Sequence, residues 1–203
     1  MRKILVGIIL LMSTSYVVAS DKALDQTGWI VGGGAGPVKL IVDPKNQPLL
    51  NSTKENTSLY TAFGGYNFSR WFGIEFDLSL SAEFTDENTG LDASILGSSF
   101  TPKFTYHFNN DFDVYLKGGL QYISYEQAVG TYYNYYISWN GIDPVIGAGL
   151  QYSFPAGVRA RLDYKYSSIN LERSENSWYG YNYYDEGIDL IFKTITLTVN
   201  YQF

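Results

Sequence analysis

Charged residues at alternate positions are the part of this sequence that could do chemistry. Five of them are cations and three are anions, so they could pair with one another or line a narrow conduit for ions or small solutes. A buried charge is stable only when it is paired or coordinated. The width of the surrounding fold therefore decides between the two roles. The eight residues are Glu75, Asp77, Lys103, Lys117, Arg159, Arg161, Asp163 and Lys165.

The segments that carry these charges alternate apolar with small or polar residues, which is the two-residue period of a β-strand. The period predicts eight strands, at 27–38, 59–68, 72–82, 94–108, 112–125, 141–154, 158–169 and 188–203. Tight turns at 69–71, 109–111 and 155–157 alternate with long polar loops at 39–58, 83–93, 126–140 and 170–187. This alternation of loop lengths predicts an all-β fold, an eight-stranded antiparallel up-and-down transmembrane β-barrel with its short turns on the periplasmic side.

The apolar face of each strand is predicted to contact lipid. In the segment 72–82, for example, Phe76 and Leu78 alternate with Glu75 and Asp77. The apolar faces are wide and bulky, whereas the charged faces carry both signs, so we place the charges inside, where they can pair. Because eight strands enclose only enough space for side chains to fill, we predict an ion-pair network that plugs the interior.

Aromatic residues near the ends of the hairpins predict two girdles at the membrane interfaces. We expect the periplasmic girdle to contain Trp29, Phe68, Trp71, Phe72, Phe108, Phe112, Phe154, Tyr201 and Phe203. We expect the outer girdle to contain Tyr60, Tyr122, Tyr166 and Trp139. The last ten residues alternate polar and apolar without an error and end on Phe203. This ending resembles the signal that the outer-membrane assembly machinery reads, so that machinery is a predicted partner.

Residues 1–20 have the features of a cleaved secretory signal peptide, which leaves a barrel domain at 21–203. Arg2 and Lys3 precede an apolar stretch at 4–12, and small residues permit cleavage after Ala19 or Ser20. The net charge of −6 becomes −8 without Arg2 and Lys3, and an acidic chain is not expected to bind nucleic acid. The sequence contains no cysteine, which excludes a disulfide, a thiolate metal site and a lipid-anchored cysteine. We predict no cofactor and no metal site.

Three stretches resemble OmpA-like outer-membrane β-barrels, and the resemblance covers essentially the whole mature chain. They are residues 27–34 (TGWIVGGG), residues 63–75 (FGGYNFSRWFGIE) and the closing Tyr201, Gln202 and Phe203. The resemblance implies a barrel class rather than one activity, with outer-membrane lipid and lipopolysaccharide as partners. A narrow gated conduit has been suggested for related barrels, which makes an ion or small-solute channel the first alternative. The sequence ends at the barrel, without the peptidoglycan-binding domain of full-length members, so a wall-tethering role is not expected.

A lipid A-modifying enzyme, such as a deacylase, is the second alternative. Its chemistry would need a histidine beside a serine and a carboxylate, at the outer leaflet. His107 is the only histidine, and it lies next to Phe108 and the tight turn at 109–111, at the predicted periplasmic end. We therefore predict that His107 is an inward-facing polar residue and that the chain has no catalytic residues.

The outer loops are where a specific function is expected, because connecting segments carry most binding residues. Tyr and Trp together with Asn, Ser and Gly form adaptable contact surfaces in other binding loops. The hypothesis is adhesion to a host, phage or sugar surface; the alternative is solvated loops whose aromatic rings settle into the outer interface. The sequence thus predicts a structural or surface-interaction protein without naming its external ligand. The candidate contacts are Tyr132, Tyr133, Tyr135, Tyr136, Trp139, Trp178 and Tyr179.

Overall fold

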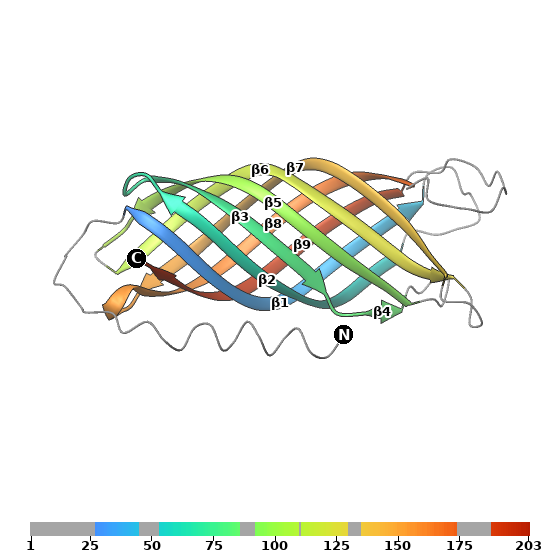
Figure 1. The fold of residues 1–203 in the computed structure, drawn as a ribbon, viewed down its shortest axis with the longest axis horizontal. Coiled ribbons are helices and arrows are strands. Elements are labelled where there is room, and N and C mark those ends of the chain that lie inside the picture. Colours follow the sequence, from blue (N-terminus) through green and yellow to red (C-terminus); the bar gives the residue numbers. More distant parts are fainter. Residues whose placement is uncertain (1–26, 45–52, 86–91, 110, 130–134, 174–187) are drawn as a thin grey trace.

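The computed structural model of the protein is a closed antiparallel β-barrel (Figure 1). It describes residues 27–44, 53–85, 92–109, 111–129, 135–173 and 188–203. Neighbouring strands in the chain pair with each other, except that β3 and β4 both pair with β5, and β1 also pairs with β9. The strands are β1 (Gly28–Pro44), β2 (Thr53–Asn67), β3 (Phe72–Ser81), β4 (Phe84–Thr85), β5 (Asp92–His107), β6 (Phe112–Val129), β7 (Tyr135–Ser153), β8 (Val158–Arg173) and β9 (Ile188–Gln202).

A bulge divides one barrel strand into β3 and β4. Leu80 pairs with Leu96 and Phe84 pairs with Ala93, so four steps along β3–β4 face three steps along β5. The additional residue reverses which side chains point inward, as β-bulges do. As a result Phe84 enters the lumen although Leu80, four residues earlier, faces outward. Counting β3 and β4 as one strand gives the eight strands that the sequence predicts.

The two ends of the barrel differ in their connections. The strands cross Figure 1 obliquely, and the tight turns gather at the end where the C-terminus lies. We call this the turn end, and the opposite end the loop end. At the turn end the chain between β7 and β8 passes through the short 3-10 turn η1 (Pro155–Gly157), where Ala156 and Gly157 have positive φ. No helix among the described residues is long and apolar enough to cross a membrane.

The strands continue further toward the loop end than the sequence predicts. β1 runs to Pro44 instead of residue 38, β2 begins at Thr53 instead of 59, and β7 begins at Tyr135 instead of 141. The predicted loops at 39–58 and 126–140 are therefore wrong over much of their length. Most of their outward side chains are polar, with Ile41 on β1 an exception, so these strand extensions have much of the composition of loops. β5, with 16 residues, and β7, with 19, exceed the roughly ten residues that span a bilayer.

Toward the turn end, the inner face is polar and the outer face is apolar. Glu75 and Asp77 are 1% and 3% exposed, whereas Phe76 and Leu78 between and beside them are 49% and 51% exposed. A soluble barrel would show the opposite pattern, because apolar surface is driven out of water. This half of the barrel is therefore built to contact hydrocarbon. We call its filling of buried polar side chains the polar layer.

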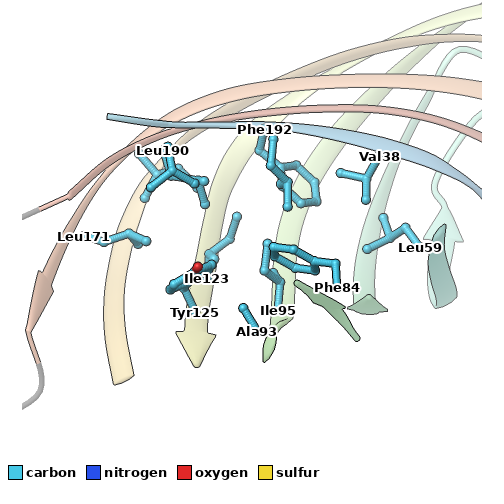
Figure 2. Close-up of a cluster of buried hydrophobic side chains, with 13 residues drawn as sticks. Val38, Leu59, Phe84, Ala93, Ile95, Ile123, Tyr125, Leu171, Leu190 and Phe192 are labelled. Atoms are coloured by element: carbon cyan, nitrogen blue, oxygen red, sulfur yellow. The ribbon is translucent and has the colours of Figure 1, made fainter. Parts of the chain in front are cut away.

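Toward the loop end, the inner face becomes apolar (Figure 2). On β8, inward-facing Arg161 and Asp163 are followed at the same parity by Ile169 and Leu171. The outward neighbours there, such as Asn170, are exposed and polar, so this part of the barrel is built like a soluble one. We call this filling the apolar layer. It consists of Val38, Leu40, Val42, Leu59, Phe84, Ala93, Ile95, Ile123, Tyr125, Ile169, Leu171, Leu190 and Phe192.

Truncating a side chain in the apolar layer is expected to cost more stability than truncating its lipid-facing neighbour. Ile95 is 0% exposed and Leu96 is 54% exposed. Ile95→Ala leaves a cavity, so we expect the free energy of unfolding in lipid vesicles to fall by about 2–5 kcal/mol. Leu96→Ala is the matched control, and we expect a smaller loss because lipid can fill the space. Equal losses in urea titrations would contradict a packed apolar layer.

Candidate functional site

Glu75 is the centre of the polar layer. Its carboxylate accepts hydrogen bonds from the Lys103 ammonium at 2.7 Å and from both terminal nitrogens of Arg161 at 2.9 and 3.1 Å. The Lys117 ammonium lies 3.4 Å from the second oxygen. The cations come from β5, β6 and β8, so one anion on β3 joins four strands across the lumen. Such a buried cluster is stable only because its charges satisfy one another.

The guanidinium of Arg161 contacts two aromatic rings. The guanidinium carbon lies 4.6 Å from the centre of the Phe63 ring and 4.7 Å from that of Tyr115. Arg161 Nε also donates a hydrogen bond to the Tyr115 hydroxyl at 3.0 Å. These two ring contacts and the bidentate pair with Glu75 restrict the rotation of the guanidinium. Tyr115 reaches across because residue 149 is glycine, and a Cβ there would overlap with the Tyr115 hydroxyl.

The remaining carboxylates extend the network toward the loop end. Asp163 lies 2.9 Å from Arg161 and 3.0 Å from Lys117, and Asp77 lies 3.0 Å from Lys165. Asp77 also accepts a hydrogen bond from Ser99 at 2.9 Å. The structure thus brings seven of the eight singled-out charges into direct contact. The eighth, Arg159, is also buried.

Asp113 is the member of the polar layer that the sequence analysis missed. It is 1% exposed, accepts a hydrogen bond from Gln151 at 2.8 Å and also contacts the ring of His107. It shares its parity on β6 with Lys117, which was assigned to the interior, so counting along the strand would have found it. With Asp113, the set has five cations and four anions rather than three.

His107 is at the turn end, held between two acceptors. Nδ1 lies 2.5 Å from Asp113, and Nε2 lies 2.6 Å from the backbone carbonyl of Arg70. The ring therefore links β5 to β6 and to the turn between β2 and β3. No serine among the described residues hydrogen-bonds to it. The described residues also include no group of three His, Cys, Asp or Glu side chains placed to hold a metal ion.

The lumen between the two layers is nearly filled. A cavity of about 10 Å³ remains beside Asp77, Lys165 and Thr194, which is room for a single water. Beyond it lies the apolar layer, where the buried polar side chains among the described residues are Glu55, Gln127 and the hydroxyl of Tyr125. The described part of the barrel therefore has no continuous aqueous path through its interior.

The aromatic residues predicted for the turn end lie on the outer wall, where several of them contact another aromatic ring. Ring centroids are 5.2 Å apart for Trp29 and Tyr66, and 5.4 Å apart for Tyr201 and Phe203. Phe203 is 66% exposed, and its N–H donates a hydrogen bond to the Trp29 carbonyl at 3.1 Å. Phe203 thus lies beside the contact between β9 and β1 that closes the barrel. Its recognition by the assembly machinery stays a prediction.

Trp139 does not belong to the outer girdle. It has the inward parity on β7, it is half-buried against the apolar layer, and its ring centroid lies 5.7 Å from that of Tyr125. The prediction failed because it began the strand at residue 141 and treated Trp139 as part of the preceding loop. Tyr60 and Tyr122 are exposed on the outer wall, and Tyr166 is partly exposed there.

Most of the candidate loop contacts fall outside the described residues. These are Tyr132, Tyr133, Trp178 and Tyr179. The backbone of Tyr135 and Tyr136 belongs to β7, but their side chains are also outside what the structure describes. The predicted signal peptide at 1–20 lies outside the described residues as well.

Comparison with known proteins agrees with this geometry. The family of outer membrane protein beta-barrel domains matches residues 7–203. The chain belongs to this family. Membership places the barrel in an outer membrane, with its apolar outer wall in lipid. No curated protein sequence matches the chain significantly.

Solved structures of small outer-membrane barrels share the fold. Neisserial surface protein A is 11% identical, with a TM-score of 0.64 over 87% of this chain and 97% of that one. OprG from Pseudomonas aeruginosa is 12% identical, with a TM-score of 0.60 over 87% and 97%. Ail, the attachment invasion locus protein of Yersinia pestis, is 15% identical in complex with the heparin analogue sucrose octasulfate, with a TM-score of 0.55 over 87% and 99%. At these identities the likeness shows the fold alone.

Removing the central anion is expected to destabilise the barrel strongly. Glu75→Gln leaves Lys103, Lys117 and Arg161 buried without their shared partner, so we expect a loss of about 3–5 kcal/mol in the free energy of unfolding in vesicles. Glu126→Gln makes the same chemical change at an exposed position on β6 and is the matched control. We expect it to change stability by less than about 1 kcal/mol. Similar effects of both substitutions would contradict a stabilising network.

Proposed function

We propose that this outer-membrane barrel has a structural or surface-interaction role and acts through its outer surface, not through its lumen. The observation that carries the proposal is the filling of the lumen by two layers of side chains. An ion would have to displace Arg161 from Glu75 and then cross the apolar layer. Both steps are unfavourable, because they leave buried charges unpaired and take the ion out of water.

The barrel wall above the membrane supports a role at the cell surface. The strands extend beyond the length needed to span lipid, and their outer face there is mostly polar, apart from residues such as Ile41 and Ile191. The packed apolar layer makes this extension rigid, so it can carry the loops clear of the bilayer. Ail, which shares the fold, is named an attachment protein and was solved with a sulfated sugar analogue. Adhesion to a host, phage or sugar surface is accordingly the proposed kind of interaction.

We propose no catalytic activity for the chain. His107 is the one histidine, and both of its ring nitrogens are engaged at the turn end. A lipid A-modifying reaction would take place at the opposite end, at the outer leaflet. Mass spectra of lipid A from cells with and without the protein test this point, because a changed acylation or phosphate pattern would refute it.

The filled lumen leads to a prediction for planar-bilayer recording. We expect no discrete conductance steps from the purified, folded barrel, because side chains fill the described part of its interior. A porin inserted into the same bilayer is the positive control. Reproducible unitary steps that disappear when the barrel is heat-unfolded would contradict the proposal and favour the narrow channel.

The surface role leads to a prediction for the loop between β6 and β7. Replacing Tyr132, Tyr133, Tyr135 and Tyr136 together with Ser is expected to reduce binding to cells or glycans at least tenfold, since aromatic residues dominate contact energies at such surfaces. The variant Trp178→Ser with Tyr179→Ser tests the last loop separately. Heat-modifiable gel mobility checks that both variants are folded. Unaltered binding by both would remove these residues from consideration.

A further inference from the structure

Two lysines face each other on the outer wall where β1 meets β9. Lys39 and Lys193 are directly paired in the antiparallel register, and both have the outward parity of their strands. Like charges at paired positions repel and destabilise a sheet unless a counter-charge lies between them. No carboxylate among the described residues is within salt-bridge distance of either ammonium. An anion from outside the described residues would therefore stabilise this pair of ammonium groups.

The same row continues with hydrogen-bond donors on the flanking strands. Asn56 on β2 pairs with Lys39, and Tyr166 on β8 pairs with Lys193. The Lys193 ammonium lies 5.6 Å from the centre of the Tyr166 ring. At a strand spacing of about 4.8 Å, the four side chains form a line of donors about 14 Å long. We call Asn56, Lys39, Lys193 and Tyr166 the basic row.

The basic row lies at the outer edge of the lipid-facing wall. On β9, the outward residues Val199, Leu197 and Ile195 are 57%, 63% and 49% exposed, and Lys193 is the next one toward the loop end. On β1, Lys39 is likewise the first charged outward residue after Pro37. Tyrosine and lysine are the residues that occupy the level of lipid headgroups. Lys39 and Lys193 are thus the first outward charges that a headgroup in the leaflet on the loop side would meet on β1 and β9, although Ile41 and Ile191 follow them on the same face.

The positive charge of the basic row is bounded on its loop side by negatively charged residues. Two residues above Ile41 and Ile191, the same two strands present the pair Asp43 and Asp189. A large soluble polyanion approaching from the loop side would meet these carboxylates first. An anion anchored in the leaflet would reach the lysines from below and beside them without passing Asp43.

We propose that the basic row binds the phosphate of a phosphorylated lipid headgroup in the outer leaflet, of the lipid A type. The inference rests on the outer-membrane location and deepens the proposed surface role by naming a partner and its residues. A phosphate placed between Lys39 and Lys193 relieves their repulsion and accepts hydrogen bonds from both ammonium groups. Asn56 and the Tyr166 hydroxyl supply neutral donors to the same headgroup, while its acyl chains lie along Ile195 and Pro37.

Retention of lipid A by the purified, folded barrel in detergent tests the proposal. Native mass spectrometry with added diphosphoryl lipid A measures the apparent affinity. Because one lysine near a membrane surface contributes roughly fivefold, we expect Lys39→Gln and Lys193→Gln each to weaken retention about fivefold and the double variant about thirtyfold. Arg70→Gln removes the same charge from an exposed turn at the other end and is expected to leave retention unchanged.

A second measurement separates binding from a structural role. In vesicles of phosphatidylcholine alone, Lys193→Gln is expected to leave the barrel as stable as the parent or more stable, because repulsion from Lys39 is removed. In vesicles that also contain diphosphoryl lipid A, the same substitution is expected to lower the urea midpoint. A shift of the same sign in both membranes would overturn the proposal, since a structural lysine would not respond to the lipid.

Two further arms identify the source of the phosphate. Lipid A stripped of its phosphates is expected to be retained no better by the parent than by the double variant. Excess inorganic phosphate is expected to compete only weakly; complete displacement would mean that the site takes a free anion and would overturn the lipid assignment. If Lys39→Gln and Arg70→Gln retain lipid A equally well, the basic row is rejected as a binding site. If the same barrel also shows no conductance steps in bilayer recordings, the proposed function still stands.

Discussion

A strand that passes from hydrocarbon into water must exchange its apolar face for its polar one, and this constraint organises the whole barrel. In lipid, the outer wall needs Phe76 and Leu78, so the inward positions can be polar. Above the lipid, the outer wall must be polar, so the inward positions must supply a core such as Leu40 and Ile169. The polar and apolar layers of the lumen are therefore consequences of one change of solvent along each strand.

The narrowness of the barrel then determines what each layer does. Eight strands leave room for side chains and almost nothing else, so the charges of the polar layer lie close enough to bond directly. Glu75, Arg161 and Asp163 satisfy one another across the lumen, and this pairing fills the interior of the membrane-spanning half. The apolar layer closes the loop end and stiffens the wall that projects from the membrane. The proposed function at the outer surface rests on both.

The sequence predicted the membrane-spanning half well, because outward residues that contact hydrocarbon must be apolar and therefore produce a regular alternation along each strand. The eight charges that it assigned to the interior are buried or nearly so, although it missed Asp113, and the predicted strand 72–82 agrees with β3 to within one residue. It failed where the outward side chains are polar. Positions such as Lys39 and Asn170 have the composition of loops, although their inward neighbours Leu40 and Ile169 continue the strand. Trp139 was misplaced for the same reason.

Period and composition by themselves determined the number of barrel strands, their order, and which side chains meet lipid, since these depend on local alternation and on loop length. Tertiary structure alone decided which charges bond to which, because the partners of Glu75 lie 28, 42 and 86 residues away along the chain. It also decided that Phe84 enters the lumen after a bulge, and that Lys39 faces Lys193. Register across neighbouring strands creates these contacts, and no single strand contains it.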